Sequence, residues 1–342
     1  MRVVISNEAF GKNDCKNLPL LSIIAFGLQG RHDIITDPII NQEDEPVKGT
    51  NLSKWVQEQS NELAEEIMFA LSLGVEEGIG GGGAKAKDEI YITADKKSVW
   101  DSQPPRLSLR DAWYLLDRSL HILVENGRND GKFVETMFKR VLGQSYWQPV
   151  KRALENKWIH IRNGGGIGEM KKIVDSLADD QVALIRTCAV FDSDAPEPQS
   201  PSDASEKLRK KCKARDIEHH QLQRRAIENY LPREALKAWV EFLSEPDKSC
   251  YREVVNTFSG INRDQRHHFH MKKGFELNNL PALYDALSRE DKKRLARGFK
   301  SNIGDIFYEE NFKISNDWIK KDFSKADKKN LINLHNIVLT KI

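Results

Sequence analysis

The sequence predicts an α/β protein in which a parallel sheet is flanked by helices. Its middle third contains short apolar runs that are typical of buried strands, and amphipathic segments of helical period lie between them. Strands that alternate with helices in this way pair in parallel, because each helix carries the chain back across the sheet. The predicted strands are Leu120–Val124, Trp158–Arg162 and Ala183–Phe191, and the predicted helices between them are Lys132–Leu142 and Ile167–Leu177.

Residues 1–115 are predicted to form a separate N-terminal α+β region. The glycine-rich stretch 78–83 lacks the Gly-Lys-Ser/Thr ending of a phosphate-binding P-loop, so we expect a mobile loop there. The pattern elsewhere in this region indicates strands at Arg2–Ser6 and Glu89–Thr93, a helix at Ser53–Leu73, and a further helix that begins at Ser108.

Residues 116–235 contain the sheet, and residues 236–342 are predicted to form a helical, basic C-terminal region. Residues 1–200 carry 24 basic and 30 acidic side chains, whereas residues 201–342 carry 29 basic and 21 acidic ones. A basic half beside acidic motifs suits a phosphodiester polymer, and a solvated helical surface accounts for the same charge equally well. The predicted helices of this part are Pro232–Leu243, Leu280–Ser288, Lys292–Phe299 and Asp327–Leu339.

Length and composition restrict the class of protein. A chain of 342 residues suggests two domains, and 39% apolar with 30% charged residues is typical of a polar globular protein. No apolar stretch reaches the roughly 18 residues that a membrane span needs, and the first residues are too polar for a signal peptide. The four cysteines are widely separated and form no CxxC pair. We therefore expect a reduced, cytoplasmic protein with no membrane association, and the sequence leaves open whether it forms a homo-oligomer.

Four carboxylates follow the ends of two predicted strands. Glu125 and Asp130 come after the first strand, and Asp192 and Asp194 come after the third. Because the carboxyl ends of parallel strands meet in one crevice, we expect these side chains to lie close together and to repel one another. A hard divalent cation, which binds oxygen ligands, relieves such repulsion. The pattern therefore predicts a magnesium or manganese site that acts on phosphates.

These segments resemble the Toprim domain, which is shared by topoisomerases, bacterial primases, OLD-family nucleases and recombination-repair proteins. The family pattern is a strand ending in Val-Glu-Gly-x-x-Asp, then a glycine-rich turn after the second strand, then a strand ending in Asp-x-Asp. The matching segments are Val124–Asp130, with one residue more than the pattern has, Asn163–Gly166 and Phe191–Asp194. The resemblance implies that residues 116–235 are a catalytic domain with a Toprim-like parallel sheet.

A further segment resembles the OLD-type branch of this family. Gln223–Pro232 is similar to the branch's Arg-x-x-Glu-Asn-Tyr-Leu stretch, and the similarity implies that Glu228 supports the metal site. The step Lys273-Gly274 is similar to the branch's catalytic-lysine position. Lys273 is therefore the predicted catalytic lysine, and Lys272 is nearly as good a candidate.

The resemblance also implies roles for the carboxylates. Asp192 and Asp194 would hold one Mg²⁺ or Mn²⁺ ion, with Glu228 near it. Glu125, together with Asp130, would hold or neighbour a second ion or act as general acid or base, and the spacing does not choose between these roles.

Basic side chains in the second half are candidates for contacts with a nucleic-acid backbone. Arginine binds phosphate bidentately, so Arg224 and Arg225 are predicted to grip phosphates, with surface ion pairs as the alternative. The other predicted nucleic-acid contacts are Lys272, Lys292, Lys293 and Arg294.

The sequence thus predicts an enzyme, a metal-dependent nuclease that cleaves DNA or RNA, and the resemblance implies a role in anti-phage defence. OLD nucleases usually carry an ATPase domain, whereas this chain has no P-loop, so we expect a separate ATPase or sensor protein as partner. Two alternatives stay open: a non-catalytic Toprim module that binds and regulates a partner, and a protein related to primases or topoisomerases.

Overall fold

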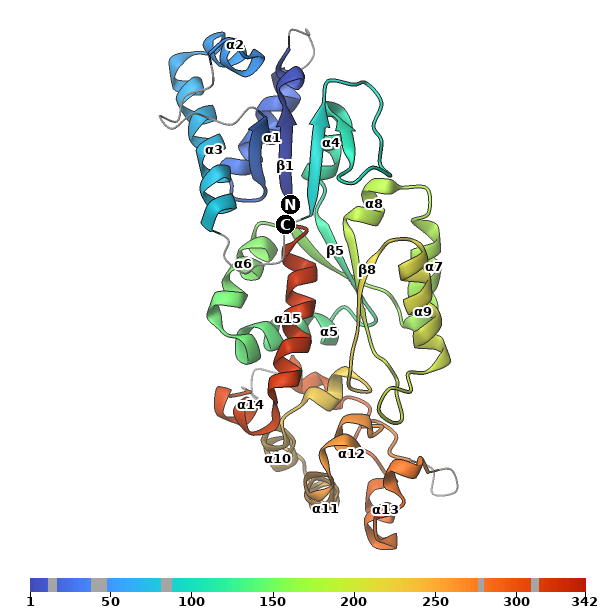
Figure 1. Ribbon diagram of the computed structural model, residues 1–342. Helices are drawn as coiled ribbons and strands as arrows, with labels where there is room; N and C mark the ends of the chain where they lie inside the picture. Colours follow the sequence, from blue (N-terminus) through green and yellow to red (C-terminus); the bar gives the residue numbers. More distant parts are fainter. Residues whose placement is uncertain (12–16, 38–47, 81–87, 276–279, 309–313) are drawn as a thin grey trace.

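The protein contains two parallel sheets, each flanked by helices (Figure 1). The computed structural model describes residues 1–11, 17–37, 48–80, 88–275, 280–308 and 314–342. The predicted α/β class is confirmed, since every strand pair in both sheets is parallel. The strands are β1 Arg2–Ser6, β2 Asp33–Asp37, β3 Glu89–Thr93, β4 Arg106–Ser108, β5 Leu120–Val124, β6 Ile159–Asn163, β7 Thr187–Phe191 and β8 Glu218–Gln221.

The N-terminal region is a parallel α/β unit, so the prediction of an α+β region was wrong. Its sheet has the order β2-β1-β3-β4, and its core is built from alternate strand residues such as Val3, Ile5 and Ile92. Helix α1, with its buried Leu20 and Ile23, covers this sheet and was not predicted. The helices are η1 Asn7–Phe10, α1 Asn17–Leu28, α2 Asn51–Gln57, α3 Asn61–Gly80 and α4 Leu109–Asp117.

The single helix predicted at 53–73 is two helices. Thr50 caps α2, because its hydroxyl accepts a hydrogen bond from the amide of Ser53. Helix α2 ends at Gln57, and α3 begins at Asn61. The loop predicted at 78–83 is also partly wrong, since Gly78 to Gly80 form the last turn of α3. Residues 81–83 lie outside the described residues.

The second sheet has the order β6-β5-β7-β8 and confirms the parallel sheet predicted for the middle of the chain. The strand predicted at 183–191 is shorter, because residues 181–185 form α8, which Asp180 caps by accepting a hydrogen bond from Ala183 N. Strand β8 has the polar sequence EHHQ and was not predicted. The helices around this sheet are α5 Asn129–Thr136, the π-helical turn η2 Met137–Leu142, α6 Gln144–Glu155, α7 Ile167–Ser176, α8 Gln181–Ile185 and α9 Asp203–Ala214.

The C-terminal helices share one hydrophobic core with this sheet. That core extends from Leu120 on β5 to Val338 on α15, the long helix that runs back toward the N-terminal unit (Figure 1). The helix predicted at 280–288 is only a 3₁₀ turn. None of the helices in the described part of the chain combines the length and hydropathy of a bilayer-spanning segment. The elements are η3 Ile227–Tyr230, α10 Arg233–Glu241, α11 Asp247–Gly260, α12 Arg263–His268, η4 Ala282–Tyr284, α13 Arg289–Leu295, η5 Ile303–Phe307, α14 Asn316–Asp322 and α15 Lys325–Leu339.

The two sheets have the same strand order. In each, the first strand lies between the second and third, and the fourth lies outside the third. Open parallel sheets of this kind have a crevice at the carboxyl ends of the inner strands. In the N-terminal sheet, Asn7 follows β1 at this place, and its side-chain oxygen accepts hydrogen bonds from the amides of Asn51 at 2.9 Å and Leu52 at 3.3 Å. The first turn of α2 therefore lies over that end of the sheet.

Candidate functional site

Glu125 and Asp192 lie at the carboxyl ends of two neighbouring inner strands. Strands β5 and β7 pair in parallel, so their last residues end at the same edge of the sheet. The backbone amide of Asp192 donates a hydrogen bond of 2.9 Å to Oε1 of Glu125. The two acidic motifs therefore meet, as their positions after strands predict.

The glycine turn after β6 supports the backbone of the first motif. Gly164 N donates to Val124 O at 2.6 Å, and Gly166 N donates to Glu125 O at 3.1 Å. A Cβ on Gly164 would lie 2.4 Å from Cγ of Met170 and 2.8 Å from Val124 O, so no larger residue fits without movement. Glycine at this position lets the turn approach the end of β5 closely.

The Asp192–Asp194 loop is tied to the segment that follows β8. Asp194 has a positive φ of 50°, an αL conformation that Asp tolerates better than most residues, and its amide donates to Arg225 O at 2.8 Å. The amide of Ile227 donates to Oδ1 of Asp192 at 3.1 Å. These contacts place Glu228, the next residue along, beside the two aspartates.

Asp130 and Glu228 form the buried side of the site. Asp130 is 9% exposed and Glu228 is 2% exposed. Asp130 lies in the first turn of α5, and its Oδ2 accepts a 2.8 Å hydrogen bond from the amide of Asn126. Gly304 of η5 packs closely against Glu228, since a Cβ on Gly304 would lie 2.9 Å from Oε1 of Glu228.

Burial, together with mutual repulsion, raises the pKa values of Glu125, Asp130, Asp192 and Asp194. Burial is the main cause that raises the pKa of Glu125 to about 7 and that of Asp130 to about 6, and repulsion from neighbouring carboxylates adds to it. The pKa of Asp192 stands well above its usual value because of burial and of repulsion by the other four acids. Burial also raises the pKa of Asp194, although Arg225 and Lys272 oppose this.

Lys272 is the cation of this group. Its Nζ lies 2.8 Å from Oε1 of Glu228, and 43% of its side chain is exposed. Burial alone would lower its pKa, but attraction to Glu228, Asp192 and Asp130 outweighs burial and raises the pKa. Lys273, the residue predicted as catalytic, instead lines a separate cavity of ≈ 550 Å³.

The carboxylates are held by the chain's own donors in this arrangement. Oxygens of Glu125, Asp130 and Asp192 accept backbone hydrogen bonds, and Glu228 is paired with Lys272. Among the residues that the structure describes, no group of three or more His, Cys, Asp or Glu side chains is arranged to hold a metal ion. A metal bound here would therefore require some of these side chains to turn.

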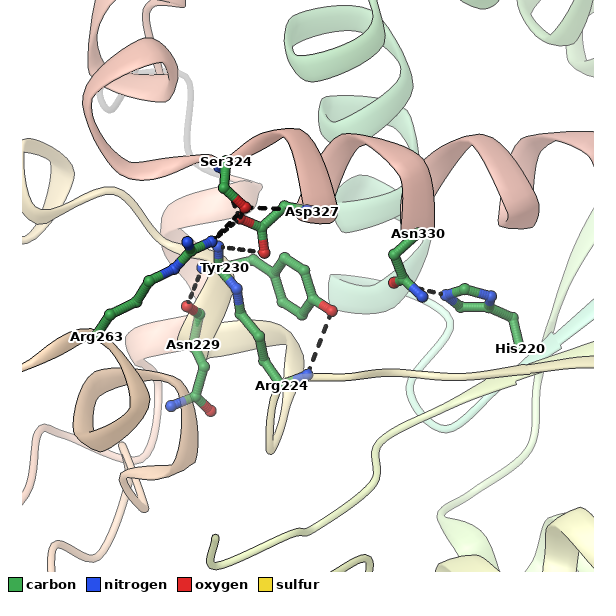
Figure 2. A network of polar contacts seen from close by, with 8 residues as sticks. All are labelled: His220, Arg224, Asn229, Tyr230, Arg263, Ser324, Asp327 and Asn330. Atoms are coloured by element: carbon green, nitrogen blue, oxygen red, sulfur yellow. Dashed lines mark hydrogen bonds and ion pairs between the residues drawn. The ribbon is translucent and has the colours of Figure 1, made fainter. Parts of the chain in front are cut away.

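Arg224 is buried, so the prediction that it grips a phosphate was wrong. Its side chain is 4% exposed and forms an ion pair of 3.0 Å with Asp327 at the start of α15 (Figure 2). The guanidinium stacks over the rings of Tyr230 and Phe323, at 4.5 and 4.7 Å from their centroids. The arginine therefore joins the loop after β8 to the last helix.

The other predicted nucleic-acid contacts lie on two surfaces. Arg225 lines the same cavity as Lys273 and is near Asp194. Lys292, Lys293 and Arg294 lie on α13, but Nη2 of Arg294 is 2.5 Å from Oε1 of Glu290, so part of this charge is paired within the helix. The end of α13 packs against the turn that contains Lys272, Lys273 and Gly274, since a Cβ on Gly274 would lie 2.4 Å from Leu295 O.

Several residues at the site were not found from the sequence. Asn129 donates from Nδ2 to Oδ1 of Asp305 at 3.1 Å, which brings another acid from η5 next to the motif at β5. Ser205 of α9 donates to Asp192 O at 2.6 Å and fixes the second motif from behind. Neither Asp305 nor Ser205 belongs to a motif, and both interactions join chain segments that are distant in sequence.

In comparisons with family models, with curated proteins and with solved structures, no match to this chain was found.

Proposed function

We propose that the protein is a divalent-metal-dependent nuclease of the Toprim type, which hydrolyses phosphodiester bonds of DNA or RNA. The observation that supports the proposal most is the meeting of Glu125, Asp130, Asp192, Asp194 and Glu228 around Lys272. The acids come from three separate segments, each placed at the same edge of the sheet. Such a concentration of partly buried negative charge is unfavourable by itself and is characteristic of sites that bind cations.

The donor set fits Mg²⁺ or Mn²⁺, because both prefer carboxylate oxygens. Asp192, Asp194 and Glu228 would hold an ion, with Glu125 and Asp130 beside them, once some of these side chains have turned. When bound, the ion would polarise the phosphodiester and lower the pKa of a water molecule.

The chain's own residues supply the remaining requirements. The backbone amide of Asp192 donates a hydrogen bond to Glu125 and so orients this carboxylate, which can act as a proton acceptor at the edge of the acidic group. The half-exposed Lys272 can turn from Glu228 toward a substrate phosphate and balance the charge that develops on it. Lys272 therefore replaces Lys273 as our candidate for the lysine that contacts the phosphate.

The decisive experiment is a cleavage assay with the purified full chain. Single- and double-stranded DNA and RNA would be incubated after EDTA treatment, with and without added Mg²⁺, Mn²⁺ or Ca²⁺. We expect cleavage with magnesium or manganese only, and a loss of at least about 100-fold in rate for Glu125→Gln and Asp192→Asn. Glu169→Gln serves as the matched control, because Glu169 is an exposed acid of α7 that pairs with Lys172.

Two outcomes would count against this function. Cleavage that persists in EDTA, or that is as fast in Glu125→Gln and Asp192→Asn as in the wild type, would exclude the carboxylate group as the reactive centre. Absence of cleavage with every substrate and metal, together with retained metal binding, would favour the non-catalytic binding module.

A further inference from the structure

A second cavity lies where the N-terminal unit meets the rest of the chain. Its volume is ≈ 580 Å³, which is within the range of small-molecule sites. It is lined by Gly30 and Arg31 from the turn after α1, by residues of α6 including Gln148 and Arg152, and by Trp158. It shares no lining residue with the carboxylate group.

The cavity is cationic. Two of the residues that line it are arginines, and none of the described lining residues is Asp or Glu. Ile342 also lines it, but its terminal carboxylate accepts a hydrogen bond from the N-terminal ammonium of Met1, whose positive charge offsets it. The nearest acid that pairs with the lining arginines is Asp117, whose side chain is 66% exposed and whose Oδ1 lies 4.0 Å from Nη1 of Arg31. Such a distant, solvated carboxylate offsets little charge.

Arg31 is a buried cation with incomplete hydrogen bonding. Its side chain is 7% exposed. A guanidinium has five N–H donors, but here Nη2 donates to Asp117 O at 2.7 Å while the buried Nε has no partner. A second buried arginine, Arg186, lies near enough that the two cations repel, which adds to the effect of burial in lowering the pKa of Arg186 to about 9. An anion close to these two cations would relieve their repulsion.

Arg152, the second arginine that lines this cavity, is held in place by two contacts. Arg152 donates from Nη2 to Gln29 O at 2.6 Å, and its Cζ lies 5.6 Å from the ring centroid of Trp158. The turn fits around it because Gly30 has a φ of 64°, and a Cβ there would lie 3.2 Å from Nη2 of Arg152. Two arginines from different elements thus line one cavity, with the guanidinium of Arg152 over the ring of Trp158.

We propose that this cavity binds a nucleoside phosphate, with its phosphate oxygens at Arg31 and Arg152 and its base against Trp158. Paired guanidinium groups match phosphate geometry, and an aromatic ring accepts any nucleobase by stacking. The cavity is too large for inorganic phosphate alone. Because its walls come from both the N-terminal unit and α6, the ligand joins the two parts of the protein. This site is independent of the proposed nuclease centre.

The test is binding of ATP, AMP, adenosine and inorganic phosphate to the full-length protein, measured by calorimetry in EDTA. EDTA keeps metal–nucleotide complexes away from the carboxylate group. We expect one ATP or AMP per chain, and binding that is at least about tenfold weaker for adenosine and for inorganic phosphate. Gln148, which also lines the cavity, allows a test of whether the ligand is an anion. Gln148→Glu should weaken ATP binding about tenfold, and Gln148→Lys should strengthen it.

The controls separate the cavity from general charge. Arg152→Gln should weaken ATP binding at least about tenfold, whereas Lys151→Gln removes the same charge from α6 outside the cavity and should change it less than about twofold. Glu125→Gln should bind ATP as the wild type does. The proposal is overturned if no probe binds at millimolar concentration, if Gln148→Glu and Gln148→Lys bind alike, or if inorganic phosphate binds as tightly as ATP.

Discussion

Lys272 and Lys273 are neighbours in the chain, yet their side chains lie in different surroundings. Only Lys272 reaches Glu228, while Lys273 lines the adjacent cavity. We expect Lys272→Met to lower the single-turnover cleavage rate at least about 100-fold, because the metal ion would then have to balance the charge that forms on the phosphate without the lysine. Lys273→Met is the matched control and should affect substrate binding more than rate. Equal loss of rate in both variants would return the catalytic role to the pair as a whole.

The raised pKa of Glu125 has a consequence for stability. A carboxyl whose pKa is about 7 in the folded protein and near 4.5 when unfolded binds its proton more tightly in the fold. Stability of the metal-free protein should therefore fall as the pH rises from about 4.5 to about 7. Glu125→Gln should increase the free energy of unfolding at pH 8 by about 1–3 kcal/mol and have little effect at pH 4.

Thermal or urea unfolding in EDTA would measure this difference. Glu169→Gln, on the exposed face of α7, should leave the stability unchanged at both pH values. A destabilised Glu125→Gln protein at pH 8 would show that the carboxylate is stabilised by its donors rather than strained by its neighbours.

At this scale the sequence was informative where residues follow strands. The positions of Glu125 and Asp192 after predicted strands predicted their meeting, because strand ends share one edge, whereas Glu228 was expected there only from the resemblance of its segment. It did not separate Lys272 from Lys273, since the choice depends on how one turn packs against the end of α13. Nor did it indicate that Arg224 is buried, because a basic residue in a polar segment is usually exposed.

At the scale of elements, α15 is anchored at its first turn by a buried ion pair. Burial alone would raise the pKa of Asp327, but Arg224 and the hydrogen bonds from Ser324 outweigh burial and lower the pKa to about 2. The stability that this acid contributes should therefore be complete above about pH 4 and be lost as the pH falls toward 2. Asp327→Asn should destabilise the protein by about 3–5 kcal/mol at pH 7, because it leaves Arg224 buried without its partner.

Urea unfolding at pH 7 and pH 3 would test this, with Asp317→Asn as the control. Asp317 pairs with Lys320 on α14, and both side chains are more than three-quarters exposed, at 82% and 76%. We expect the control to change stability by less than about 0.5 kcal/mol. A loss in Asp327→Asn no larger than in the control would contradict the anchoring role.

Which elements could be predicted depended on how strongly their residues follow a period. Strand β5 and helices α4 and α7 are apolar or amphipathic. The structure has β5 and α7 within a residue or two of their predicted ends, and α4 begins one residue after its predicted start. Strand β8 consists of polar residues and becomes a strand only by pairing with β7, which no local pattern records. The apolar residues near 280–288 pack into the core without a regular helix.

For the molecule as a whole, the basic C-terminal region should show itself in salt dependence. If α13 binds nucleic acid, each lysine that neutralises a duplex phosphate contributes about 0.9 to the slope of log affinity against log salt. The double variant Lys292→Gln/Lys293→Gln should therefore have a shallower slope than the wild type. Lys96→Gln/Lys97→Gln removes two exposed charges from the N-terminal unit and is the matched control. An equal slope in wild type and the Lys292/Lys293 variant would mean that α13 is a solvated surface.

The N-terminal unit is the region where we expect an ATPase or sensor to dock. Helix α3 exposes Glu62, Glu65 and Glu66 together with Phe69, which is 59% exposed. Changing the three glutamates to lysine should abolish protection from phage in cells that also express the neighbouring genes, while purified nuclease activity is unchanged. Full protection by the lone wild-type chain and by the triple variant would exclude a docking partner on α3.

The shared connectivity of the two sheets means that this chain carries its own internal comparison. Both sheets have the same strand order, and one difference between them is the residue that directly follows the first strand of each, β1 or β5. After β5 that residue is an acid, Glu125, whose oxygen faces the neighbouring strand end. After β1 it is an amide, Asn7, which tethers α2. The residue at this equivalent position thus distinguishes the two sheets. With Glu125, the crevice of the second sheet is lined by acids, and with Asn7, the crevice of the first sheet is covered by α2.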